Sequence, residues 1–160
     1  MTNREIAAIL FNIAGLLSEA QGNPYRINAY RRAARNILRT PHSLIQRARA
    51  GQPLEVPWLG ASLTSKITAL AKGDPLPFYE ELCVGLPLGE RALQRIPGMG
   101  PVLAARIARA LGEVTPAGLS DAAANGKLRR IWGVGPQRTA TLLRAYGSPA
   151  PAQQLTLALE

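Results

Sequence analysis

The hydrophobic pattern near the start of the chain predicts an amphipathic helix. Thr2 and Glu5 are spaced for a capping box at its start, and Gly22 is a suitable stop. The spacing of three and four positions between apolar residues puts them on one face of a helix. These apolar residues are Ile6, Ile9, Leu10, Ile13, Leu16 and Leu17. We therefore expect this segment to pack one face against a core.

The following pattern predicts further helices and no strand. A second helix is expected over residues 24–38, because Asn23 is a suitable cap and proline is favoured at the first helical position. Pro41 breaks it, and residues 43–48 fit a short third helix. No stretch alternates apolar and polar residues for long, whereas turn signals recur between helical patterns. The predicted fold class is all-α.

The chain divides into two helical bodies and a tail by its proline and glycine content. The sequence Leu-Pro-Leu-Gly at residues 86–89 predicts a link, with one domain over residues 1–84 and a second over residues 88–147. Residues 148–152, Ser-Pro-Ala-Pro-Ala, are typical of an extended linker. Residues 148–160 are accordingly expected to form a flexible tail.

Charge is unevenly distributed along the 160 residues and indicates a polyanionic partner. The net charge is +9, and it separates into +6 over residues 1–50, −3 over 51–90 and +6 over 91–160. Two basic blocks around an acidic centre indicate two surfaces that face a polyanion. Sixteen of the nineteen cations are arginine, which suits bidentate phosphate contacts. A GC-rich genome is an alternative source of the arginine preference, but it does not explain the net excess.

Composition excludes several classes of protein. A hydrophobic content of 47% is enough for a packed core. One cysteine and one histidine exclude a disulfide framework and an ordinary zinc site. The longest uncharged stretch near the start, residues 6–18, is too short for a bilayer and, following Glu5, makes a poor signal peptide. We expect a soluble protein of the cytoplasm, associated with the nucleoid and not with a membrane.

Three short segments repeat one pattern before a predicted helix. They are residues 56–60 (Val-Pro-Trp-Leu-Gly), 96–100 (Ile-Pro-Gly-Met-Gly) and 131–135 (Ile-Trp-Gly-Val-Gly). Glycine allows a tight hairpin with positive φ, and the next helix begins with unpaired N–H groups that suit an anion. A phosphate diester held there positions the protein without reading a base. The first segment departs from the pattern with Trp58 in place of glycine, so a distorted hairpin is expected. The candidate DNA-binding residues in these segments and the helices that follow them are Gly60, Gly98, Gly100, Arg106, Gly133, Gly135 and Arg138.

The repeated pattern resembles the helix-hairpin-helix motif of DNA repair proteins. The order of features over residues 3–147 is similar to the N-terminal part of family X DNA polymerases, comprising a lyase-like domain and a second helix-hairpin-helix domain. The resemblance rests on residues 23–34 (Asn-Pro-Tyr-Arg-Ile-Asn-Ala-Tyr-Arg-Arg-Ala-Ala), the hairpins and residues 125–129 (Asn-Gly-Lys-Leu-Arg). No Asp-x-Asp pair is present, so nothing in the sequence can hold the Mg²⁺ ions of nucleotidyl transfer. We therefore expect no polymerase activity.

The resemblance implies two open interpretations of Lys66. In that family, a lysine on the helix after the first hairpin attacks the aldehyde of a 5′-deoxyribose phosphate as a Schiff-base nucleophile, and the alignment places Lys66 there. The alternative is a cation that faces DNA phosphate. Leu54 and Ser62 stand where well-studied members carry lysines, which weakens the anion site. The positions that match the 5′-phosphate pocket of the family are Arg26, Tyr30, Arg31 and Arg32.

The family also holds a monovalent cation through hairpin carbonyl groups, so Na⁺ or K⁺ is implied here, with no other cofactor required. The candidate ligands are the backbone carbonyls of Val56, Leu59, Ile96, Met99, Ile131 and Val134.

The last residues resemble the peptide that binds the bacterial sliding clamp. Glutamine and leucines at fixed spacing suit an extended segment whose apolar side chains enter a groove. The alternative is a segment end that docks back on the domain. The candidate partner-binding residues are Gln154, Leu155, Leu157 and Leu159.

Three functions remain open from the sequence. The first is a DNA-binding repair accessory that recognises gaps, nicks or 5′-phosphorylated ends without sequence preference. The second is a 5′-deoxyribose-phosphate lyase that uses Lys66, and the third is a protein-interaction module. Trp58 and Trp132 either pack against their own helices or stack on an unpaired base.

Overall fold

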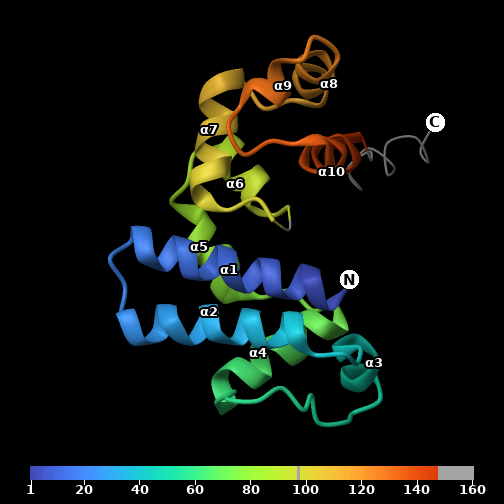
Figure 1. Ribbon diagram of the computed structural model, residues 1–160. Helices are drawn as coiled ribbons and strands as arrows, with labels where there is room; N and C mark the ends of the chain where they lie inside the picture. Colours follow the sequence, from blue (N-terminus) through green and yellow to red (C-terminus); the bar gives the residue numbers. More distant parts are fainter. Residues whose placement is uncertain (97, 148–160) are drawn as a thin grey trace, which may run out of the picture. The chain divides into compact units, whose positions relative to one another are not determined.

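The computed structural model describes residues 1–96 and 98–147 (Figure 1). Within these residues the chain forms ten helices and no strand, which confirms the predicted all-α class. None of the described helices is long and apolar enough to cross a membrane. The helices are α1 (Asn3–Glu19), α2 (Pro24–Arg39), α3 (Leu44–Arg49), α4 (Ala61–Lys72), α5 (Pro77–Val84), α6 (Leu88–Gln94), α7 (Pro101–Leu111), α8 (Pro116–Ala124), α9 (Lys127–Arg130) and α10 (Pro136–Gly147).

Helices α1 and α2 form an antiparallel pair whose starts are set by the caps expected from the sequence (Figure 1). The Glu5 N–H donates to Thr2 Oγ1 at 3.2 Å, and the Thr2 N–H donates to Glu5 Oε2 at 2.6 Å. The side chain of Asn23 accepts from the Tyr25 N–H at 2.9 Å, with Pro24 at the first helical position. Such caps satisfy N–H groups that the helix leaves unpaired.

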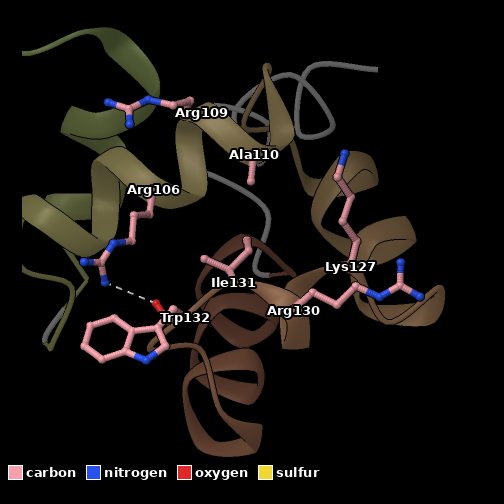
Figure 2. A pocket seen from close by; sticks show the side chains of 7 residues that line it. All are labelled: Arg106, Arg109, Ala110, Lys127, Arg130, Ile131 and Trp132. Carbon is pink, nitrogen blue, oxygen red and sulfur yellow. Dashed lines mark hydrogen bonds between the residues drawn. The ribbon is translucent and has the colours of Figure 1, made fainter.

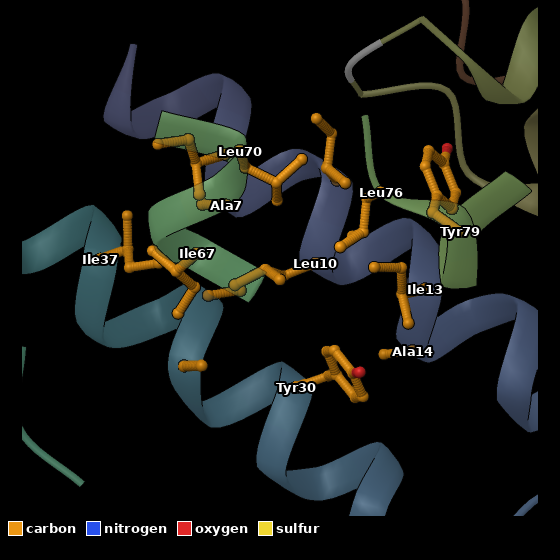
Figure 3. Packing of buried hydrophobic residues seen from close by; sticks show 14 of the residues in the cluster. Ala7, Leu10, Ile13, Ala14, Tyr30, Ile37, Ile67, Leu70, Leu76 and Tyr79 are labelled. Carbon is orange, nitrogen blue, oxygen red and sulfur yellow. The ribbon is translucent and has the colours of Figure 1, made fainter. Parts of the chain in front are cut away.

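The first core lies between α1, α2 and α4, with α5 along α1 (Figure 3). Ile6, Leu10 and Ile13 of α1 have no exposed surface, and neither do Ile37 of α2 and Ile67 of α4. Burying such a side chain is worth about 1.5–3 kcal/mol. The apolar face predicted for residues 6–17 is therefore the face that holds these helices together.

A buried polar link ties α1 to α5 and α6. The Asn12 side chain is 2% exposed, and its Nδ2 donates to Tyr79 Oη at 3.2 Å and to the Gln94 carbonyl at 3.1 Å. The Tyr79 hydroxyl also donates to the Gln94 carbonyl. Burial raises the pKa of Tyr79 to about 12, while the hydrogen bond from Asn12 acts in the opposite direction.

The chain divides into two compact units, the first covering Met1–Pro101 and the second beginning at Val102. This division falls later than the link expected at residues 86–89, where α6 begins. The physical reason is the hydrogen bonding of Asn12 and Tyr79 to the Gln94 carbonyl, which attaches α6 to the first unit. The domain limits 1–84 and 88–147 stay predictions, and the tail at residues 148–160 lies outside the described residues.

The second unit has its own small core beneath α7, α8, α9 and α10. Ile107, Leu119, Leu128 and Leu142, one from each helix, have no exposed surface. Thr115 caps α8 by accepting from the Gly118 N–H at 3.0 Å. These contacts hold the third hairpin, residues 131–135, between α9 and α10.

Candidate nucleic-acid interface

The three repeated segments share one left-handed residue at their third position. Its φ is +62° at Trp58, +87° at Gly98 and +93° at Gly133. Left-handed backbone costs a residue with a side chain roughly 1–2 kcal/mol, whereas glycine adopts it freely. Trp58 thus shares the left-handed φ of the two glycines, but the Leu59 N–H does not donate to the Val56 carbonyl as the equivalent groups of the other two segments do.

Short hydrogen bonds close the second and third hairpins. The Met99 N–H donates to the Ile96 carbonyl, and the Val134 N–H donates to the Ile131 carbonyl, both at 3.0 Å. The chain therefore turns within five residues and enters α7 and α10 at once.

The helices after the first and third hairpins begin in the same way. Both the N–H and the hydroxyl of Thr64 donate to the Gly60 carbonyl at 3.0 Å. Thr139 makes the same two bonds to the Gly135 carbonyl, also at 3.0 Å. Gly60 is the N-cap of α4 and offers no capping side chain, so the first N–H groups of that helix face outward without a side-chain acceptor.

The helix after each hairpin carries a buried apolar residue at the same position. Ile67, Ile107 and Leu142 occupy matching offsets, and all three have no exposed surface. Within the hairpins, Met99 and Val134 are also buried. The repeat seen in the sequence is thus a repeat of turn geometry and of packing.

Arg26 and Tyr30, two of the four residues matched to the 5′-phosphate pocket, meet Lys66, the candidate nucleophile, around Phe78 of α5. The Arg26 guanidinium lies 4.5 Å from the centre of the Phe78 ring, and Lys66 Nζ lies 5.5 Å from it. Tyr30 stacks on the same ring with centroids 6.2 Å apart. Lys66 Nζ also donates to Ser62 Oγ at 2.7 Å. The resulting group, the Phe78 cluster, comprises Arg26, Tyr30, Ser62, Lys66 and Phe78.

The Phe78 cluster is partly buried and leaves its cations accessible. Burial raises the pKa of Tyr30, and the neighbouring Arg26 guanidinium acts in the opposite direction. Arg26 itself is exposed, and Lys66 is half-buried. Arg31 and Arg32 also lie on α2, half-buried and exposed respectively, but no contact recorded in the described residues joins them to the cluster. Sequence reasoning missed Phe78, whose aromatic side chain after Pro77 was the available signal.

The third hairpin is lined by two of the predicted arginines. The Arg138 guanidinium donates to the Gly133 carbonyl at 2.7 Å. The Arg106 guanidinium lies 4.6 Å from the centre of the Trp132 ring and donates to the Trp132 carbonyl at 3.4 Å. Trp132 is 79% exposed and Trp58 is 82% exposed, so neither indole is packed in a core.

Few of the arginines are neutralised by carboxylates. In the described residues, the arginine ion pairs are Arg47 with Glu55 at 2.6 Å and Arg95 with Glu80 at 2.7 Å. Arg26, Arg106 and Arg138 are in neither pair. Their charges are therefore available to an anion from outside the chain.

Comparison with known proteins identifies the class of the first part of the chain. Residues 1–76, which include α1 to α4 and the first hairpin, match a family model described as a helix-hairpin-helix domain. No curated protein matches the chain. This match indicates DNA binding in general.

Proposed function

We propose that the protein binds the DNA backbone with little sequence preference, at gaps, nicks or 5′-phosphorylated ends, as a repair accessory at the nucleoid of a bacterial cell. The observation that carries the proposal is the left-handed turn repeated at Trp58, Gly98 and Gly133, each ahead of a helix. Backbone N–H groups at such turns hold phosphate oxygens and read no base. The net charge of +9 adds sequence-independent attraction.

The Phe78 cluster supports recognition of a terminal phosphate. Arg26 and Lys66 approach the same aromatic ring from α2 and α4, at 4.5 and 5.5 Å from its centre. A phosphate monoester carries more charge than a diester and gains more from two such cations. The order of features along the chain is similar to that of the N-terminal region of family X polymerases, and this similarity supports the same preference.

The test compares DNA substrates that differ in one feature at a time. Fluorescence anisotropy would measure affinity for intact duplex, nicked duplex and gapped duplex, the last with a 5′-phosphate or a 5′-hydroxyl. We expect the phosphorylated gap to bind most tightly, and Arg26→Ala to remove the advantage of the phosphate. Arg39→Ala, an exposed arginine at the other end of α2, is the matched control and should retain that advantage.

Two results would contradict the proposal. Equal affinity for all four substrates would refute recognition of ends. Failure to bind any of them at low salt would refute DNA binding and favour the protein-interaction module.

The second candidate function is a 5′-deoxyribose-phosphate lyase. Lys66 Nζ and the Arg26 guanidinium both approach the Phe78 ring, so one cluster holds an amine and a cation that can bind the 5′-phosphate. The unprotonated amine would add to the open-chain C1′ aldehyde and release water as the imine forms. Loss of the C2′ proton would then break the C3′–O bond, releasing the 5′-phosphorylated DNA, and water would free the sugar from Lys66.

Borohydride trapping separates the lyase from a binding module. If the protein is a lyase, borohydride should trap a covalent adduct with gapped DNA that carries a 5′-deoxyribose phosphate. Both Lys66→Ala and Lys66→Arg should abolish this adduct. Lys72→Ala removes the other lysine of α4, which is exposed, and should leave the adduct intact. Absence of an adduct despite measured binding would leave the binding module alone.

A monovalent cation at the hairpins is part of the proposal. Backbone carbonyl oxygens are neutral, hard ligands of the kind that coordinate K⁺, and each hairpin offers two. The carbonyls of Ile96 and Ile131 each accept one hairpin N–H, which leaves a lone pair for an ion. Replacing K⁺ by tetramethylammonium at constant ionic strength should weaken DNA binding, and an unchanged affinity would refute the role of the ion.

The tail is proposed to bind the bacterial sliding clamp through Gln154, Leu155, Leu157 and Leu159. Surface plasmon resonance against the clamp would test the full chain, with Leu157→Ala expected to abolish binding. Thr156→Ala is the matched control, because this position is free in the peptide pattern. Equal binding by both variants would refute the proposal.

A further inference from the structure

A cavity of about 410 Å³ lies in the second unit, between α7, α9 and the start of the third hairpin. Figure 2 shows Ala110 and Ile131 in its middle, with Arg106 on one side and Lys127 and Arg130 on the other. Arg109 and Trp132 complete the lining. An apolar floor is thus surrounded by cationic side chains.

The charge of this pocket has no internal counterpart. Arg106, Arg109, Lys127 and Arg130 line it, and none of its lining residues is acidic. None of the four forms an ion pair with a carboxylate in the described residues. Four like charges around one cavity repel one another, and a bound anion would relieve that repulsion. The pocket is therefore complementary to a ligand that carries negative charge.

Trp132 gives the pocket an aromatic surface. The Arg106 guanidinium covers one face of the indole at 4.6 Å from the ring centre. The residue is 79% exposed, so most of the indole is accessible to solvent. The Arg106 bond to the Trp132 carbonyl and the turn at Gly133 fix the backbone that carries the ring. An exposed indole beside cations is the arrangement by which proteins stack an unpaired base and hold its phosphate.

We infer that this pocket binds an unpaired nucleotide of a DNA strand, with the base on Trp132 and the flanking phosphates among the cations. The volume is in the range of sites for small ligands, so one nucleotide rather than a duplex enters it. Four cations can contact more than one phosphate group. This number favours a nucleotide within a strand, which has a phosphate on each side, over a free nucleotide. The inference rests on the proposed DNA binding and adds a contact to the exposed strand at a gap or end.

The experiment uses Trp132 as its own reporter. The chain has two tryptophans, so Trp58→Phe leaves Trp132 as the only one. A short 5′-phosphorylated thymidine oligonucleotide should quench its fluorescence saturably. Free thymidine monophosphate should quench only at much higher concentration, and a blunt duplex should quench little. Equal quenching by the duplex, or none by the oligonucleotide, would overturn the inference.

Matched substitutions test the pocket itself by anisotropy of a labelled oligonucleotide. Trp132→Ala should weaken binding by about 5- to 150-fold, the effect of losing one stacked base. Arg130→Ala should lower the salt slope by about one. Arg129→Ala, an exposed neighbour on α9 outside the pocket, should leave the slope unchanged. Equal losses from both arginine substitutions would refute the pocket in favour of diffuse charge.

The same variants separate this inference from the proposed function. If the pocket does not bind, Trp132→Ala will leave gapped-duplex affinity intact, and Arg130→Ala will weaken it no more than Arg129→Ala does. If DNA backbone binding is wrong, the chain will not bind duplex at all, whereas the oligonucleotide can still quench Trp132.

Discussion

Replacing Trp58 by glycine should stabilise the first unit. Trp58 has a φ of +62°, a conformation that costs a residue with a side chain roughly 1–2 kcal/mol. Glycine removes that strain but increases the entropy of the unfolded chain by an equivalent of about 0.5–1 kcal/mol. The indole is 82% exposed, so little packing is lost. The expected net gain in the free energy of unfolding is about 0.5–1 kcal/mol.

Equilibrium urea unfolding, followed by circular dichroism, would measure this gain as a higher midpoint at unchanged slope. Trp132→Gly is the matched control. Trp132 is equally exposed and also in a hairpin, but it is not among the residues with positive φ. It carries no strain to release, and the control should lose about 0.5–1 kcal/mol. If both substitutions destabilise the protein equally, the left-handed strain assigned to Trp58 is wrong.

Three further predictions concern stability and binding. Since the pKa of Tyr79 is raised to about 12 in the folded state, its contribution to stability is complete below pH 10 and is lost as the pH rises through 12. The free energy of unfolding of the wild type should fall by about 2–3 kcal/mol over this pH range, and Tyr79→Phe should not show this fall. Tyr25→Phe, at an 87% exposed position, should behave like the wild type when unfolding is measured at alkaline pH. Ile107→Ala should lower the free energy of unfolding of the second unit by about 2–5 kcal/mol, as measured with denaturant. Val102→Ala, at an exposed position, should lower it less, and the opposite order would contradict a core role for Ile107. DNA affinity should fall with salt at a log–log slope of about −0.9 per phosphate neutralised, and a salt-insensitive affinity would exclude backbone binding.

Local features of the fold could be predicted from the sequence because each depends on neighbouring residues. The capping box at Thr2, the proline start of α2 and the apolar face of α1 are all read within one or two helical turns. The hairpin repeat could also be recognised in the sequence, because its glycines and the apolar residues of the following helices recur at a fixed spacing. The first hairpin keeps a left-handed residue at Trp58 but lacks the closing N–H-to-carbonyl bond of the other two hairpins, in line with the distortion expected there.

Contacts between distant segments could not be predicted in the same way. The cations around the second-unit cavity come from two helices, and no spacing rule relates Arg106 to Lys127. Lys66 lies on α4 and Phe78 on α5, with a proline-containing loop between the two helices. The approach of Arg26 and Lys66 to the Phe78 ring therefore depends on how the helices pack. The partners of the buried Asn12 amide are 67 and 82 residues away along the chain, so no local pattern indicates them.

The buried amide of Asn12 also limits how this sequence can change over evolutionary time. Its two hydrogen bonds go to one side chain, Tyr79, and to one main-chain carbonyl, at Gln94. Losing either side chain alone leaves buried polar groups unpaired at a cost of about 1–3 kcal/mol, whereas exchanging both for apolar residues leaves only the carbonyl to satisfy. Substitutions at positions 12 and 79 should therefore occur together in descendants of this chain. Position 94 is under no such coupling, because any residue supplies the carbonyl.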